Sequence, residues 1–196
     1  MSGQTNSPAP GAHLRVRRCL YWHHGIAVND GCVVEFGGGS LLRKQATSIQ
    51  TVPYESFAEA DRVETVAHPQ RFLGSLGMGL PAALPPNEIV ARALWLTDHR
   101  PSGRYHLIGG NCEHVTNWCV TGGYFESLQV RRSFFLRSVV SAAAMLTWRW
   151  LPARWRAASV ALSLSTLVTV IDYQRVPYRR WSDLLKQYPA SCGVDG

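Results

Sequence analysis

Several residue patterns that identify common protein classes are missing from this chain of 196 residues. The cysteines are odd in number, form no CxxC pair and are spread along a chain that is long for a disulfide-stapled scaffold. No three or four Cys and His residues have the spacing of zinc ligands, and the glycines at 37–39 lack the patterns of nucleotide-binding loops. We therefore expect reduced thiols, no metal site and no cofactor. The five cysteines are Cys19, Cys32, Cys112, Cys119 and Cys192.

Long hydrophobic runs are also scarce. Residues 1–12 contain no apolar run, so we expect a disordered arm without a secretory signal, which favours an intracellular protein. Two uncharged stretches in the last third, 138–148 and 157–171, hold 11 and 15 residues. At about 1.5 Å per residue, only the second could cross a hydrocarbon core of roughly 30 Å, and only with Trp155 and Tyr173 as interfacial anchors.

Acidic residues are rare in the last third of the chain. Residues 1–130 contain 10 Lys+Arg and 10 Asp+Glu, whereas residues 131–196 contain 10 and 3, which accounts for the whole net charge of +7. Arginines interleaved with tryptophans and apolar runs are typical of segments that bind membrane surfaces, and they do not suit a polar nucleic-acid groove. We expect a helical, basic extension over 131–196 that contacts the cytoplasmic face of a membrane, as a transmembrane helix or lying flat. The alternative is a pair of soluble helices packed on the domain.

Residues 13–130 are expected to form one α+β domain. Short β-branched runs separated by Gly, Pro and Asp predict strands, and apolar residues at helical spacing predict a helix over 87–97. The predicted strands cover residues 20–28, 32–36, 49–52 and 62–66, with a further extended segment over 105–108. The first two form a hairpin around the turn at 29–31.

Candidate chemistry is concentrated in two short segments, and the second contains Cys112. A thiol attacks as its thiolate, which a helix N-terminus and a neighbouring imidazole both favour. Two glycines precede Asn111, a good N-cap residue, and apolar residues then recur at spacings of three and four. We expect a helix that starts at Cys112 and directs its free N–H groups and its positive dipole end at the sulfur.

The first segment supplies a base. Period-two alternation along the strand over 20–28 places His24 with the apolar side chains, so we expect it to be a core histidine, and leaves His23 to face a site. If the loop is the three residues 29–31, Val28 pairs with Cys32, and Glu35 lies diagonal to His23 on the same face. A two-residue loop would instead move Glu35 to the opposite face. In the favourable register Glu35 orients His23, and His23 meets the thiol.

The two segments resemble the signature boxes of the lecithin:retinol acyltransferase family, which includes the HRAS-like suppressor phospholipases and acyltransferases. The resemblance covers residues 13–125. His23, the turn at 29–31 and Glu35 correspond to the first box, whose third member is usually His. Residues 111–115, Asn-Cys-Glu-His-Val, correspond to the second box, with valine in place of phenylalanine. The resemblance implies a permuted papain-like domain with a small antiparallel sheet, followed by the hydrophobic extension that anchors many members to membranes.

The resemblance also implies a reaction. Cys112 would take an acyl chain from a phospholipid ester as a thioester and pass it to water, an amine or an alcohol. His23 would act as general base and acid, Glu35 would orient His23, Asn111 would cap the helix, and the backbone N–H of Cys112 would contribute to the oxyanion site. Two other functions stay open, a cysteine amidase or peptidase of the cell-wall type and a degenerate membrane-bound adaptor. No partner protein is indicated.

Overall fold

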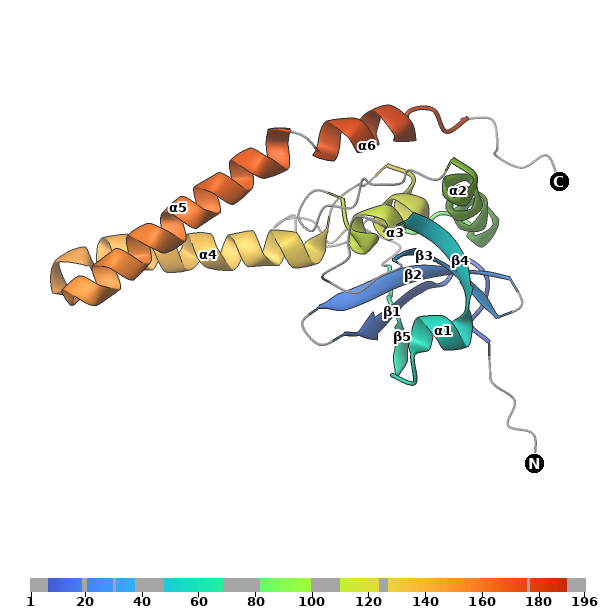
Figure 1. Ribbon diagram of the computed structural model, residues 1–196, viewed down its shortest axis with the longest axis horizontal. Helices are drawn as coiled ribbons and strands as arrows, with labels where there is room; N and C mark the ends of the chain where they lie inside the picture. The colour runs from blue at the N-terminus through green and yellow to red at the C-terminus, as the bar shows by residue number, and fades with distance from the viewer. Residues whose placement is uncertain are drawn as a thin grey trace.

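The computed structural model describes residues 7–18, 21–29, 31–37, 48–68, 82–99, 110–123, 127–175 and 177–189. Five antiparallel strands form one sheet in the order β4-β3-β2-β1-β5. The strands are β1 (His13–Arg17), β2 (Trp22–Asn29), β3 (Cys32–Gly37), β4 (Ser48–Pro53) and β5 (Val63–Thr65). Figure 1 shows α1 (Tyr54–Ala58) on one face of the sheet, and α2 (Pro86–His99) and α3 (Cys112–Thr121) on the other. The α+β prediction is therefore confirmed.

The element predictions hold with small shifts at the ends. Four predicted strands correspond to β2, β3, β4 and β5, and the predicted helix corresponds to α2. The sequence did not predict β1, although Leu14 and Val16 are buried and alternate with Arg15 and Arg17. The extended segment expected over 105–108 lies outside the described residues.

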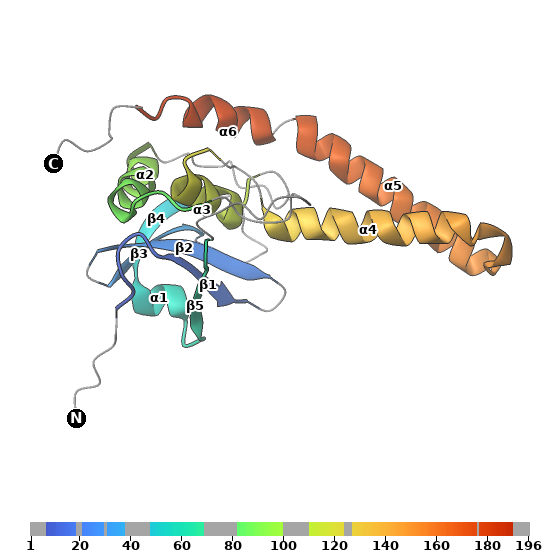
Figure 2. The ribbon, with the colours of Figure 1, turned by 180° about the vertical axis from the view of Figure 1, so that it is seen from behind.

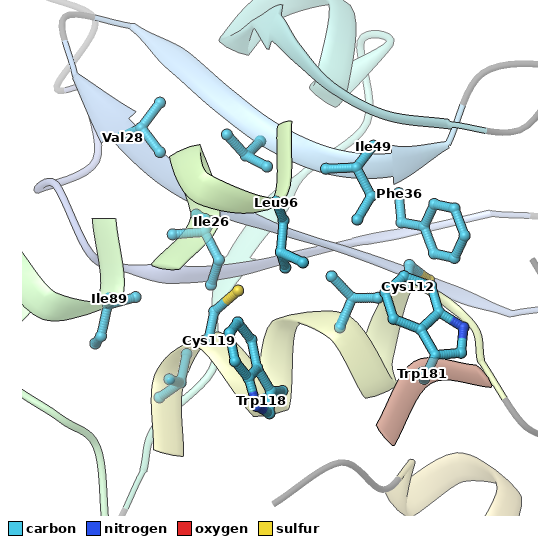
Figure 3. Packing of buried hydrophobic residues seen from close by; sticks show 14 residues of the cluster. Ile26, Val28, Phe36, Ile49, Ile89, Leu96, Cys112, Trp118, Cys119 and Trp181 are labelled. Carbon is cyan, nitrogen blue, oxygen red and sulfur yellow. The ribbon is translucent and has the colours of Figure 1, made fainter. Parts of the chain in front are cut away.

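The sheet separates two buried clusters. A small cluster joins Phe57 of α1 to Leu14, Val16, Ala27 and Val33 on one face. The larger cluster lies between the other face and the helices α2 and α3, and Figure 3 shows its side chains. Because the sheet is covered on both faces, the residues of β2 are buried along most of the strand.

A helical hairpin projects from this domain, as Figures 1 and 2 both show. Its arms are α4 (Leu128–Leu146) and α5 (Ala153–Arg175), joined by a 3-10 turn at Trp148–Trp150. The chain then returns to the domain as α6 (Pro177–Leu185), where Trp181 is fully buried in the larger cluster. The extension expected over 131–196 thus contains a projecting hairpin and a helix that packs on the sheet domain.

No helix in the described ranges combines the length and the apolar character needed to cross a bilayer. This finding corrects the expectation of a transmembrane helix. Arginines occupy the first half of α4, and serines and threonines interrupt the apolar residues of α5.

Candidate active site

His23 and Glu35 lie together on the sheet. His23 Nε2 is 2.7 Å from Glu35 Oε2, and both side chains are buried. Gly25 pairs with Glu35 across β2 and β3, so His23 and Glu35 are diagonal neighbours on one face. The carboxylate therefore holds the proton of His23 on Nε2 and leaves Nδ1 to face the other groups of the site.

The loop between β2 and β3 differs from the three-residue loop on which the predicted register depends. Asn29 pairs with Cys32, so the loop has two residues rather than three, and the predicted pair of Val28 with Cys32 is wrong. A β-bulge between Ala27 and Asn29 compensates for the missing loop residue. Without this bulge, the two-residue loop would place Glu35 on the opposite face from the imidazole.

Gln50 and Gly37 complete the surroundings of Glu35, and sequence reasoning missed both. Gln50 stands opposite Glu35 on β4 and donates from Nε2 to Glu35 Oε1 at 2.9 Å. A Cβ atom at Gly37 would lie 3.0 Å from Glu35 Oε1 and 3.2 Å from His23 Cε1, so glycine leaves room for the pair. The available signal was positional, since Gly37 follows Glu35 by two residues and shares its face of the strand.

Asn111 caps the helix that carries Cys112. Its side-chain oxygen accepts from the backbone N–H of Glu113 at 3.0 Å and of His114 at 3.2 Å, and the His114 ring accepts in return from the Asn111 N–H. Cys112 is the first residue of α3, and no residue in the described ranges accepts from its backbone N–H. The helix end therefore offers an N–H donor and the positive end of its dipole beside the thiol.

The Cys112 thiol lies at the start of β2. Cys112 Sγ is 3.9 Å from the carbonyl oxygen of Trp22, and Trp22 directly precedes His23 on that strand. Burial lowers the pKa of His23, but the interactions with Cys112 and Glu35 outweigh burial and raise the pKa to about 10. Burial raises the pKa of Glu35, and hydrogen bonds from His23 and Gln50 reverse this into a net lowering. An imidazolium between a sulfur and a carboxylate is thus favoured at neutral pH.

The neighbouring histidine has a different environment. His24 Nδ1 is 2.8 Å from His13 Nε2, and His13 Nδ1 is 2.8 Å from His68 Nε2, so three rings form a hydrogen-bonded row. Burial and the nearby His23 lower the pKa of His24 to about 3, and burial lowers that of His13 well below its ordinary value. His13 and His24 are therefore neutral at neutral pH, and His24 is the buried core histidine that the alternation predicts.

Glu113 connects the nucleophile helix to the hairpin. Its buried carboxylate accepts from the Ser127 hydroxyl and, at 3.1 Å, from the backbone N–H of Leu128 at the start of α4. Ser127 also caps α4 by accepting from the Val130 N–H. Both partners lie well along the chain, 14 and 15 residues after Glu113, so this carboxylate joins α3 to the start of α4.

Among the residues whose structure is described, no group of three or more His, Cys, Asp or Glu side chains could hold a metal ion. A helix-terminal cysteine near a histidine that a carboxylate orients is typical of thiol-dependent hydrolases and acyltransferases.

Comparison with known proteins gives the same class. The family model described as lecithin retinol acyltransferase matches residues 6–125, which is more than half of the chain. The chain belongs to this family, as the sequence motifs indicated. Comparison with curated proteins gives no match. At the level of the family, the domain is a thiol enzyme of acyltransferase or phospholipase type.

Proposed function

We propose that this protein takes an acyl chain from a phospholipid ester onto Cys112 and passes it to water, an amine or an alcohol. The observation that carries the proposal is His23 Nε2 at 2.7 Å from the Glu35 carboxylate, with Cys112 Sγ at 3.9 Å from the carbonyl oxygen of the residue that precedes His23. This arrangement supplies a nucleophile, a proton carrier and a group that orients the carrier.

The proton movements balance around His23. The thiol proton passes to His23 Nδ1 before the attack, which gives the imidazolium. Cys112 Sγ then attacks the ester carbonyl as a thiolate, and the carbonyl oxygen becomes an oxyanion near the backbone N–H of Cys112. The imidazolium protonates the departing lysophospholipid oxygen, which leaves an acyl thioester on Cys112 and a neutral His23. In the second half, His23 takes a proton from the acceptor as the acceptor attacks the thioester, and the sulfur leaves as a thiolate beside the restored imidazolium.

The hairpin is proposed to hold the site at a phospholipid surface on the cytoplasmic side. Residues 127–171 contain six arginines and no acidic residue. The turn exposes Trp150 by 75%, and its neighbours Leu146 and Trp155 by 81% and 55%. Such a surface attracts anionic headgroups and places tryptophans at the interface. It also avoids transferring a long acyl chain through water, at about 0.8 kcal/mol for each methylene.

The free thiols support the same compartment. Within the described ranges, Cys32, Cys112 and Cys119 are unpaired by disulfides. Reduced cysteines are typical of proteins in the cytosol.

The test is intact-mass analysis of the protein after incubation with phospholipid vesicles, with released fatty acid measured in the same sample. The expected result is a fatty-acyl adduct, or fatty-acid release, that Cys112→Ala abolishes and that neutral hydroxylamine reverses. Cys32→Ala is the matched control, because Cys32 is another free thiol, at the start of β3, where it pairs with Asn29 and Pro53. If wild type gives neither adduct nor fatty acid while a thiol probe still labels Cys112, the phospholipid proposal fails, and amide substrates become the next candidates.

A further inference from the structure

The last described helix, α6, packs against the buried cluster that contains Cys112. Trp181 of α6 is fully buried and lies edge-to-face on Phe36 of β3, with ring centroids 5.4 Å apart. Trp181 and Cys112 belong to one buried cluster, and Figure 3 draws them at the same corner of it. Trp181 lies outside residues 6–125, the part of the chain that matches the family model.

Residues that follow Trp181 fasten the same segment to the domain. Leu184, Leu185 and Tyr188 pack against the larger cluster, at the spacing of one helix face. The Tyr188 ring lies 5.6 Å from Trp118 of α3, in an edge-to-face arrangement, and the Arg92 guanidinium lies over it at 4.4 Å. The segment 181–188 therefore closes over α3 with an apolar face.

Cys112 is closely covered in this structure. Cys112 is only 2% exposed, and a phospholipid ester must bring its carbonyl carbon into contact with Sγ. On the sheet side of the thiol, Trp22 belongs to a central strand that is hydrogen-bonded on both edges. The buried cluster that contains Cys112 also includes Trp181 of α6, a helix that no strand pairing holds.

Both ends of the hairpin lead to this site. At one end, Glu113, the residue next to the nucleophile, accepts hydrogen bonds from Ser127 and Leu128 at the start of α4. At the other end, α5 runs to Arg175, and α6 begins two residues later at Pro177. The hairpin is thus joined to α3 through Glu113 at one end and is followed in the chain by α6 at the other.

We propose that α6 is a lid. In the free protein the Trp181 indole occupies the place beside Cys112 that the acyl chain of the substrate takes, and binding of the hairpin to an anionic phospholipid surface moves α6 away. The apolar face of α6 then meets the bilayer, and the acyl chain replaces the indole against Phe36. The inference rests on the proposed function for the identity of the acyl chain. It makes Trp181 a residue that controls access to the thiol.

The test measures opening without turnover, as the rate at which iodoacetamide alkylates Cys112, resolved by peptide mass spectrometry. Vesicles of anionic diether phospholipids are used, because they contain no ester that could acylate the thiol. We expect slow alkylation of wild type in buffer and alkylation faster by about tenfold or more with vesicles. Trp181→Ala should show the fast rate in buffer alone.

Two controls separate opening of the lid from unfolding. Cys119 lies on the same helix, is 1% exposed, and burial raises its pKa to about 12, so it is alkylated only if the domain opens as a whole. Trp150→Ala removes an exposed tryptophan at the hairpin turn and should keep the slow rate in buffer. If Cys119 is also alkylated in Trp181→Ala, that variant has opened as a whole. The test of the lid then rests on the rate of Cys112 alkylation in wild type, compared with and without vesicles.

The lid is overturned if vesicles that bind the protein leave the Cys112 rate unchanged, or if folded Trp181→Ala reacts at the wild-type rate in buffer. Either result leaves the proposed acyl transfer standing, because that activity is measured separately on ester lipids. Conversely, an inactive protein whose Cys112 is exposed by diether vesicles would keep the lid and lose the proposed function.

Discussion

Glu35→Gln is the most direct test of the role of the carboxylate. The substitution keeps the size of the side chain and an oxygen that can accept from His23 Nε2, now 2.7 Å away. Gln50 can turn its own amide to accept from the new amino group, so the packing of the three side chains is retained. What the variant loses is the negative charge beside the imidazolium.

The size of the expected loss of kcat/KM in Glu35→Gln follows from the type of hydrogen bond that Glu35 makes with His23. A buried hydrogen bond to a charged group contributes about 1.5–3 kcal/mol and a neutral one about 0.5–1.5 kcal/mol, so loss of the charge from the transition state costs about 1–1.5 kcal/mol and lowers kcat/KM by roughly 5- to 13-fold. The same loss lowers the pKa of His23 from about 10, because the attraction of Glu35 no longer offsets burial. The variant should therefore differ from wild type in the pH dependence of its activity as well as in the maximum activity.

The assay is fatty-acid release from phospholipid vesicles as a function of pH, with Glu64→Gln as the matched control. Glu64 lies on the edge strand β5 and pairs with Arg15 at 2.7 Å in a partly exposed ion pair, and such pairs contribute little. Glu64→Gln should keep wild-type activity. If Glu35→Gln is as active as Glu64→Gln over the whole pH range, the orienting role is refuted.

Three further predictions concern the same region. Gly37→Ala should lower activity while leaving most of the stability, because its Cβ would crowd the Glu35 carboxylate, whereas Gly123→Ala meets nothing within 4 Å and should match wild type in both assays. Asn111→Ala should lower the free energy of unfolding by about 0.5–2 kcal/mol in urea titrations through loss of the cap, and an unchanged midpoint would contradict the capping role. Because the folded-state pKa of His23, about 10, lies above its ordinary 6.5, its stabilisation is complete below about pH 6.5 and is lost as pH rises through about 10. Glu35 has a lowered pKa, so its stabilisation is present above pH 4.5 and is lost on further acidification. Urea unfolding at a series of pH values should therefore show the difference between wild type and Glu35→Gln shrinking at both ends, and a constant difference would count against the pair.

The identities of the reacting groups could be predicted because they depend on local patterns. Alternation along one strand distinguishes His23 from His24, and it requires only that the segment be extended. The turn before Asn111 and the periodic residues after it predict the start of α3, since capping involves backbone groups within one turn of the helix. The class of the domain follows from these local features and their order in the chain.

The pairing of His23 with Glu35 could not be derived from loop length alone. Counting residues in the turn left two registers open, and the structure uses the two-residue loop that would have separated the pair, corrected by a bulge between Ala27 and Asn29. A bulge depends on the combined packing of both faces of the sheet, which no single segment encodes. The same holds for Gln50, whose position opposite Glu35 requires the pairing of β3 with β4.

Residue type, short-range periodicity and charge are enough to predict Cys112 as the candidate nucleophile and His23 as the histidine that accompanies it. They also predict the basic, tryptophan-rich extension over 131–196. The tertiary structure alone decided that α6 returns to bury Trp181 in the cluster that contains Cys112, and that Glu113 ties the nucleophile helix to the hairpin. Contacts across such separations are selected by the burial of apolar surface and the pairing of buried polar groups in the whole fold. They are fixed only when every element is in place.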